Sequence, residues 1–494
     1  MKRELADTMP PSIRRSLEKF GADIRIARIK RDLTAAQLAD WIGIHRTTYG
    51  RVEAGDPMVA LGIYAKTLYA LGLGTPFGEV VDPRRDEEGL LLDLQRLPQR
   101  VRRQARRPIR FKLNKLSAPR RESVLRIGVL AVMSGPAAPW GLVNRQCAEV
   151  TAAMYNEAGG IDIGGERFRI EIVGFDDKLT PARAADGARH LIEEEGIRYV
   201  IGPNVEQTFA AALPVAERNR AMLFPYSFTR SLYRPPRENA VLGQVAGYQA
   251  VPSIYRYLIG KGARSIALVA PATSEGLRQR QDASKIASGL GMRVLSESST
   301  YRVGAEDIEA AVAPALARMP DVLALPNVAP FDASRLISRA RDLGFTGFIT
   351  TESAQDVAHL LEVAGAAADG LVMVGGASPE ATRSERMREF IRRYVVAAGA
   401  WNDEAGTKAY ALEFLLATLQ VAGKAALADT GRFKAVIPHF SIDDPLVSGR
   451  AALAYYGAGD FRQKRQIGIP LVVNTIRAGR QETVFTHAPE EVLS

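Results

Sequence analysis

Beyond residue 124, short apolar runs rich in β-branched residues alternate with longer stretches of helical periodicity, and this alternation constrains the fold more than any other feature. Helical patterns at 142–157, 181–195 and 207–219 separate the first of these runs. Strands that alternate with single helices form βαβ units, in which the strands are parallel. The runs expected to form strands are 125–132, 168–174, 199–203, 221–225, 265–270, 292–296, 322–325 and 348–350.

The length of this region predicts more than one lobe. The 371 residues from 124 to 494 exceed what a single core of this class comfortably holds. Parallel sheets bind ligands beyond the carboxyl ends of their strands, and two such lobes that face each other enclose a cleft. We therefore expect a two-lobed α/β unit with a ligand site between the lobes.

Several motifs in this region follow one another in the order of a known family. "IGVLAVMSGPAAPWG" begins it, "ITTESAQDVAHLLEVAGAAADGLVMVGG" lies in its second half and "GDFRQKRQIGIPLVV" closes it. Over residues 124–485 the chain resembles the branched-chain amino-acid type of periplasmic binding protein, which has a type I two-lobed fold. The resemblance implies a lobe I of about 124–246 and 372–440, and a lobe II of about 247–371 and 441–494.

The resemblance also implies which side chains line the cleft. Loops at 134–141, 203–208 and 225–230 would face the ligand from lobe I, where hydroxyls and backbone N–H groups at helix starts bind anionic groups. Glu352, from lobe II, would pair with the amino group of a ligand. The implied ligand-binding residues are Trp140, Glu206, Gln207, Tyr226, Ser227, Thr229, Glu275, Asn327 and Glu352.

The cleft loops depart from the serine- and threonine-rich turns of amino-acid binders. Residues 204–208 are NVEQT, residues 226–229 are YSFT, and SEG stands at 274–276, where the family often has a tyrosine. Glu206 would repel a ligand carboxylate, whereas Arg230 would offset that repulsion or be a surface residue. A bulkier and more aromatic pocket suits an amide, an aromatic acid or a cation.

Three of these aromatic and acidic residues have a structural alternative. Tyr226 and Phe228 are either pocket wall or lobe core, and Glu352 is either a ligand contact or an exposed loop charge. The sequence leaves these alternatives open.

The first 95 residues have a helical pattern instead. Apolar residues at helical spacing between 17 and 27 predict a first amphipathic helix. Thr34 and Gln37 form a capping box, in which the hydroxyl and the amide satisfy free N–H groups at a helix start. Gly43 permits a sharp turn, and a second short helix follows from about 45 to 54. Two short helices around a glycine turn follow the helix-turn-helix plan, whose second helix enters the DNA major groove.

Residues 13–107 resemble the Xre/Cro type of helix-turn-helix domain, closest to the HipB-type antitoxin regulators. The stretch "LTAAQLADWIGIHRTTYGRVEAGDPM" carries this resemblance. It implies that Gln37 bonds a phosphate at the head of its helix. Arginine pairs with guanine, and threonine or histidine contacts base edges or phosphates. The further implied DNA-binding residues are His45, Arg46, Thr47, Thr48 and Arg51.

Other residues of this region have structural explanations. We expect Trp41 and Tyr49 to lie in the core of the domain, and Glu53 to form an internal salt bridge or a helix cap. Gly50 lies inside the second helix, where glycine costs about 1 kcal/mol of helix stability.

The net charge of +10 is confined to one segment. Residues 1–95 have 14 basic and 14 acidic side chains, and residues 122–494 have 40 basic and 41 acidic ones. Residues 96–121 have 11 basic residues and no acidic one. A like-charge block of this kind forms a solvated linker that binds nucleic acid when it adjoins a DNA-binding domain, and Pro108 and Pro119 predict a semi-flexible linker.

The sequence argues against secretion, membrane insertion and catalysis. The first residues mix charges and have no apolar stretch, so we expect no secretory signal. The single cysteine, Cys147, suits a reducing compartment. The five histidines are scattered without metal-ligand spacing, and no phosphate-binding glycine loop occurs. We expect a cytoplasmic protein that is not an enzyme and has no metal, cofactor or membrane partner.

These observations predict a ligand-responsive transcriptional regulator of multi-domain architecture: an all-α helix-turn-helix domain (1–95), a basic linker (96–123) and a two-lobed α/β domain (124–494). We expect it to bind double-stranded DNA as a homodimer, because one such domain makes few contacts, and to bind a small-molecule effector. One alternative is a solute-binding protein of an ABC-type amino-acid uptake system with a fused N-terminal domain. Another is an antitoxin-like repressor whose second domain is a scaffold without ligand.

Overall fold

The computed structural model describes residues 9–31, 33–71, 73, 123–135, 137–376, 379–449, 452–457 and 461–493. The chain divides into two compact units, Met1–Ala118 and Pro119–Ser494. We call them the N-terminal unit and the two-lobed unit and describe each by itself. The expected basic linker at 96–121, and the expected DNA-binding domain beyond residue 73, lie outside the described residues.

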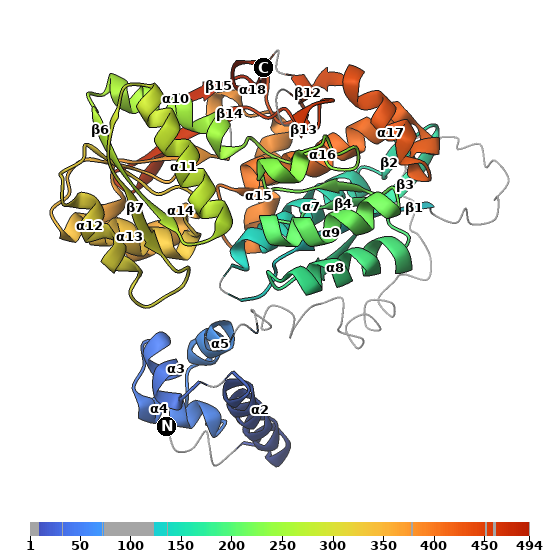
Figure 1. Cartoon of the computed structure of the whole chain (residues 1–494). Coiled ribbons are helices and arrows are strands. Elements are labelled where there is room, and N and C mark those ends of the chain that lie inside the picture. The colour runs from blue at the N-terminus through green and yellow to red at the C-terminus, as the bar shows by residue number, and fades with distance from the viewer. Residues whose placement is uncertain are drawn as a thin grey trace, which may run out of the picture. The chain divides into compact units, whose positions relative to one another are not determined.

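The described part of the N-terminal unit is helical (Figure 1). Its small core buries Ile24, Leu38, Tyr49, Val52 and Leu68, so the expectation that Tyr49 is a packing residue is confirmed. The helices are α2 (Pro11–Ile29), α3 (Ala35–Trp41), α4 (Arg46–Glu53) and α5 (Leu61–Ala70).

The expected cap and turn are present between α3 and α4. The Thr34 hydroxyl accepts the Gln37 N–H at 3.2 Å, and the Gln37 Oε1 accepts the Thr34 N–H at 2.9 Å. Gly43, with φ +70°, takes the left-handed conformation that the turn needs. The Glu53 carboxylate pairs with Arg28 at 2.5 Å, which confirms the expected internal salt bridge and ties α4 to α2.

Trp41 is not a core residue, contrary to expectation: 62% of its surface is exposed. Leu38, Ala39 and Ile42 face the core from this segment. At 3.6 residues per turn, Trp41 lies roughly 100° around the helix from their mean direction. The helix therefore turns the indole toward solvent.

Lobe I contains a five-stranded sheet in the order β2-β3-β1-β4-β5, with β2 antiparallel and the other strands parallel. Helices α7, α15 and α16 share one buried cluster with this sheet, and α8 and α9 share the other (Figure 1). The strands are β1 (Ser123–Ala131), β2 (Ile161–Ile163), β3 (Glu166–Asp176), β4 (Tyr199–Ile201) and β5 (Met222–Phe224). The helices are α7 (Pro139–Glu157), α8 (Pro181–Arg189), α9 (Glu206–Arg218), α15 (Glu385–Ala398), α16 (Ala405–Ala422) and α17 (Thr430–Val436).

Lobe II contains a seven-stranded sheet in the order β15-β14-β10-β9-β8-β6-β7. Its β6–β10 strands are parallel, whereas β14 and β15 are antiparallel additions. The strands are β6 (Ser265–Pro271), β7 (Arg293–Tyr301), β8 (Val322–Ala324), β9 (Phe348–Thr350), β10 (Leu371–Gly375), β14 (Leu471–Arg477) and β15 (Arg480–His487). The helices are α10 (Gly247–Gly260), α11 (Ser274–Gly289), α12 (Val312–Leu316), α13 (Pro330–Asp342), α14 (Val357–Ala364) and α18 (Pro489–Leu493).

A third, antiparallel sheet places the last lobe boundary later than expected. Its strands are β11 (Ser441–Asp443), β12 (Ala452–Tyr456) and β13 (Gln466–Ile467). Leu453, Tyr455 and Ile467 pack into the lobe I core. Residues 441–467 thus belong with lobe I, and not with lobe II as the resemblance implied, because their apolar side chains fill the space beside α16. All eight apolar runs expected to form strands do form strands.

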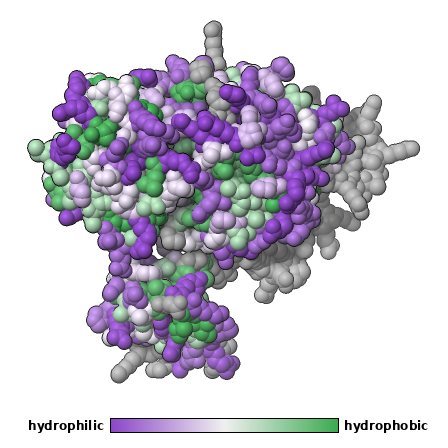
Figure 2. All heavy atoms as spheres, in the orientation of Figure 1, coloured by the Kyte–Doolittle hydropathy of each residue, from purple (hydrophilic) through white to green (hydrophobic). Residues whose placement is uncertain are grey.

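Hydrophilic side chains predominate on the face shown in Figure 2, with scattered apolar ones between them. Within the described residues, no helix combines the length and the apolar character that crossing a membrane requires.

Candidate functional site

A cleft lies between the two lobes, at the three places where the chain crosses from one lobe to the other. Gln244 and Val245 line it from the first crossover, Gly375 from the second, and Ile469 and Pro470 from the third. The carboxyl ends of β4, β8 and β9 lead into loops that also line it. This is the position at which ligands bind to sheets of this topology.

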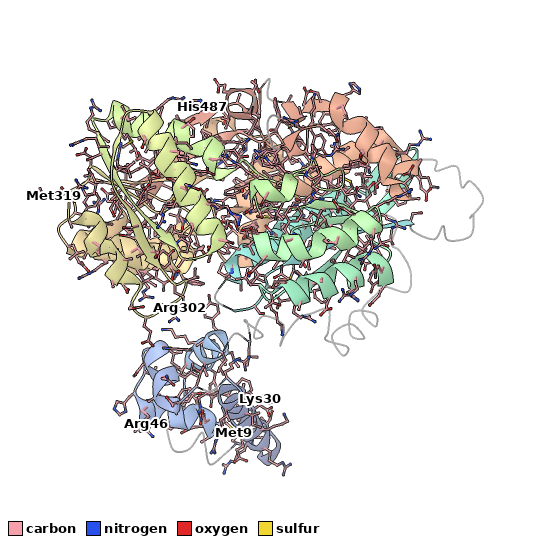
Figure 3. All side chains as sticks on the ribbon, in the orientation of Figure 1. Met9, Lys30, Arg46, Arg302, Met319 and His487 are labelled. Carbon is pink, nitrogen blue, oxygen red and sulfur yellow. The ribbon has the colours of Figure 1, made fainter. Side chains whose placement is uncertain are left out.

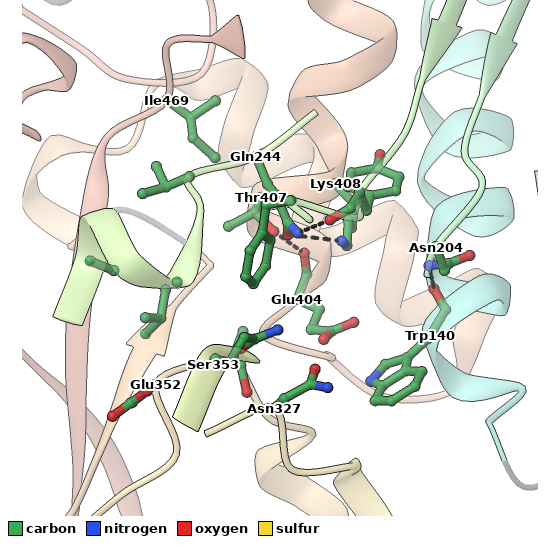
Figure 4. Close-up of a pocket in the computed structure, with 18 of the residues that line it drawn as sticks. Trp140, Asn204, Gln244, Asn327, Glu352, Ser353, Glu404, Thr407, Lys408 and Ile469 are labelled. Atoms are coloured by element: carbon green, nitrogen blue, oxygen red, sulfur yellow. Dashed lines mark hydrogen bonds between the residues drawn. The ribbon is translucent and has the colours of Figure 1, made fainter. Parts of the chain in front are cut away.

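One wall of the cleft carries a buried lysine. The Lys408 ammonium, on α16, lies 3.5 Å from the centre of the Tyr226 ring and donates to Gln244 Oε1 at 3.3 Å. Burial lowers the pKa of Lys408, and the neighbouring Glu404 carboxylate opposes that effect. Burial likewise raises the pKa of Glu404, which Lys408 opposes. Both side chains line the cleft (Figure 4), and each charge favours the charged form of the other.

Glu275, at the start of α11 in lobe II, reaches across the cleft to lobe I. Its Oε2 accepts the backbone N–H of Glu206 at 3.3 Å, and its Oε1 accepts the Ser227 hydroxyl at 3.4 Å. Burial is the main cause that raises the pKa of Glu275 to about 7. A lobe II carboxylate thus occupies the N–H donor at the head of α9 and the Ser227 hydroxyl in the loop after β5.

Glu352 lies in the loop after β9, with a left-handed φ of +57° and 6% of its surface exposed. It accepts a hydrogen bond from the Tyr255 hydroxyl. Burial raises the pKa of Glu352 to about 7. The alternative that Glu352 is an exposed loop charge is wrong, because the loop turns its carboxyl into the interior. Figure 4 shows it near Ser353 and Asn327, while Trp140 and Asn204 stand on the opposite side.

The sequence profile of a family described as "Periplasmic binding protein" matches residues 124–466. The chain belongs to this family. The matched residues include lobe I and most of lobe II and of the cleft lining, and leave the N-terminal unit outside the match. No curated protein matches the chain.

Solved structures of periplasmic binding proteins share the two-lobed fold. The leucine-binding protein LivK of Thermotoga maritima is 19% identical, with a TM-score of 0.61 over 74% of this chain and 100% of that one. The substrate-binding protein LivJ of Streptococcus pneumoniae, solved with isoleucine, is 18% identical, with a TM-score of 0.61 over 74% and 99%. A solute-binding protein of R. palustris, solved with benzoate, is 18% identical, with a TM-score of 0.61 over 74% and 97%.

Five of the nine expected ligand-binding residues line the cleft of this family member, and four do not. Glu206 lies outside the cleft lining, where it pairs with Arg278 of lobe II at 2.7 Å, and Gln207 donates to the Leu179 carbonyl at 2.8 Å. Ser227 and Thr229 are buried beneath the loop that carries them. The residues in the lining are Trp140, Tyr226, Glu275, Asn327 and Glu352.

For Tyr226 and Phe228, the two alternatives of pocket wall and lobe core both hold. Tyr226 and Phe228 both line the cleft, and both also pack against lobe I core clusters. Arg230 is not in the cleft lining; its guanidinium stacks on Tyr248 and lies 3.5 Å from Asp282.

Sequence reasoning missed Lys408 and its partner Glu404. An i, i+4 Glu–Lys pair on a helix ordinarily marks a solvent-exposed face. The signal that would have found them is the rest of α16, which is mostly apolar apart from Glu413 and Thr418 and is buried from Ala405 to Leu419 except at Thr407. A charged pair in such a helix faces a polar interior site.

In the N-terminal unit, the expected DNA-binding residues lie around the start of α4. His45 and Thr47 are exposed, Thr48 is half-buried, and Arg46 projects from the surface (Figure 3). Arg51 pairs with Asp56 at 2.7 Å, and the Oε1 of Gln37 is engaged in the cap of α3.

Proposed function

We propose that the two-lobed unit binds one small organic molecule between its lobes. The observation that carries this proposal is a polar cleft lined by both lobes and by all three crossovers. Its lining combines ionisable side chains, among them Glu352 and Lys408, with apolar ones such as Val328 and Ile469. A few polar groups in a largely apolar concave site are typical of small-molecule binding.

A thermal-shift screen of the full chain tests this proposal. Leucine, isoleucine and benzoate, the ligands named for the similar structures, form the first set, followed by amides and amines. A ligand at 100 times its dissociation constant should raise the free energy of unfolding by about 2.7 kcal/mol. Absence of a shift with every class would contradict the proposal.

We further propose that the N-terminal unit binds DNA, so that the whole chain acts as a ligand-controlled transcriptional regulator in the cytoplasm. The supporting observation is the arrangement of α3 and α4 around Gly43, with the exposed His45, Arg46 and Thr47 at the start of α4. The recognition helix of a helix-turn-helix domain presents such residues to the major groove. The basic segment 96–121 supports the same proposal through its charge.

Fluorescence anisotropy with labelled double-stranded DNA tests this second proposal. Binding should weaken steeply with salt, and neutralising arginines of 96–121 should flatten that salt dependence. Arg46→Ala should weaken binding at least about tenfold, the loss expected when one bidentate base contact is removed. Lys66→Ala, an exposed cation on α5, is the control and should leave affinity nearly unchanged.

The solved structures favour a second candidate, a solute-binding protein of an uptake system with an N-terminal helical extension, because several of them carry that description. Ligand binding without DNA binding would favour this candidate. DNA binding without any ligand would favour an antitoxin-like repressor with a scaffold domain. Light scattering with and without DNA measures the homodimer that the regulator requires.

A further inference from the structure

The charges that line the cleft do not balance. The cleft lining contains three carboxyl groups, those of Glu275, Glu352 and Glu404, and one ammonium, that of Lys408. Glu275, Glu352 and Lys408 are buried, and Glu404 is half-buried. Burying a charge without a counter-charge is costly, and a ligand that enters the cleft either relieves or aggravates this imbalance.

The position that a ligand carboxylate would need is already filled. The Glu275 carboxylate, in the cleft lining, accepts the N–H of Glu206 at the head of α9 and the hydroxyl of Ser227, two lobe I donors whose residues lie behind that lining. A helix start with such donors is an anion site. The protein's own lobe II carboxylate therefore takes the place of an anionic ligand group.

Lys408 does not provide a replacement anion site. Its ammonium is held between the Tyr226 ring and Gln244 Oε1, and the negative charge of Glu404 raises its pKa against the effect of burial. A ligand carboxylate would have to displace these groups and would then stand among three carboxyl groups.

The side chains that line the cleft are suited to bind a cation. Glu404 lies between Trp140 on one side and Ser353 and Asn327 on the other (Figure 4). Indole faces attract ammonium and amidinium groups. Glu352 has the Tyr255 hydroxyl as its hydrogen-bond donor and no cation beside it among the described residues.

We infer that the cleft binds a small organic cation, an amine or amidine with a short apolar or aromatic body, and rejects ligands that carry a carboxylate. This inference rests on the proposal that the cleft binds a small molecule. It names the chemical class of the ligand, which would be the effector of the proposed regulator or the solute carried by a solute-binding protein.

Isothermal titration calorimetry of the full chain at pH 8 with a matched series tests this inference. The series is 3-methylbutylamine, leucine and 4-methylpentanoate, which share one apolar body, together with benzylamine and benzoate. The amines should bind at least about tenfold more tightly than the compounds with a carboxylate. Tighter binding of leucine, 4-methylpentanoate or benzoate would overturn the inference and leave the proposed ligand-binding function intact. Binding of none of the five at roughly 10 mM would contradict both.

Two variants and a control sharpen this test. Glu352→Gln should weaken amine binding at least about tenfold, because it removes the carboxylate that lacks a cation. Glu362→Gln removes the same charge from the exposed surface of lobe II and should have no effect. Glu275→Ala frees the Glu206 N–H and the Ser227 hydroxyl and should allow benzoate or leucine to bind. Unchanged ligand preference in Glu275→Ala, with native circular dichroism, would overturn the claim that Glu275 fills an anion site.

Discussion

At the residue scale, the buried carboxyl groups of the cleft set the chemistry of the site. Glu352 illustrates how backbone and burial act together. A left-handed backbone of φ +57° turns its side chain inward, where burial raises the pKa of the carboxyl to about 7. Trp41 shows the opposite case, since its position around α3 leaves a large apolar side chain in solvent. The residue type alone predicts neither the buried carboxyl of Glu352 nor the exposed indole of Trp41.

The titration of Glu352 predicts a pH dependence of stability. Its pKa rises from 4.5 in the unfolded chain to about 7 in the fold. A group whose pKa is raised by folding contributes stability that is fully present below the unfolded pKa and is lost as the pH rises through the folded pKa. The free energy of unfolding of the ligand-free protein should therefore fall between about pH 4.5 and pH 7.

Glu352→Gln removes this titration, so its free energy of unfolding should fall less over the same range, by roughly 3 kcal/mol at most. Urea denaturation at several pH values measures the difference. Glu362→Gln, which is exposed, should reproduce the slope of the unmodified protein. Identical slopes for Glu352→Gln and the unmodified protein would contradict the prediction.

At the element scale, α4 and α16 place the candidate functional residues. The start of α16 is held by Asp403, which accepts the Gly376 N–H at 3.0 Å and the Asn474 amide at 3.2 Å. These bonds link a lobe I helix to the second crossover and to lobe II. In the N-terminal unit, α4 packs so closely on α2 that a Cβ at Gly55 would lie 2.0 Å from the Leu17 carbonyl oxygen.

The two glycines of this segment should respond oppositely to alanine. Gly50 is exposed, and a Cβ built there meets nothing within 4 Å. Gly50→Ala should therefore stabilise α4 by about 1 kcal/mol. Gly55 combines a φ of +69° with the close contact to α2, so Gly55→Ala should destabilise the N-terminal unit. Hydrogen exchange of the α4 amides should slow in Gly50→Ala and accelerate in Gly55→Ala. Faster exchange in Gly50→Ala would contradict the prediction that a methyl group at this position meets open space.

At the scale of the whole two-lobed unit, side chains join the lobes across the mouth of the cleft. Glu206 of lobe I contacts Arg278 at 2.7 Å and accepts from the Ser274 hydroxyl at 2.8 Å. Such contacts favour a closed arrangement of the lobes. A ligand that is selective for that arrangement shifts the population toward it.

Arg278→Ala should loosen this closure only modestly. The Arg278 side chain is 45% exposed, and a partly exposed ion pair of this kind contributes at most about 1 kcal/mol. Ligand affinity should fall by no more than about fivefold, and small-angle scattering should show a larger radius of gyration without ligand. Arg256→Ala, on the exposed side of α10, is the control. A loss much above tenfold would mean that Arg278 contacts the ligand itself.

The order of strands and helices, the two lobes, the cap of α3 and the loops that reach the cleft were all predictable from the sequence. Each follows from local periodicity or from motifs that lie close together in the chain. Tertiary structure decided what faces the cleft. Gln207 points to Leu179, whereas Glu404 and Lys408, which look like a surface pair in the sequence, line the cleft wall. The physical reason is that burial and charge pairing depend on side chains from segments far apart in the sequence. The fold brings these segments together at the three crossovers, so no local sequence pattern predicts their contacts.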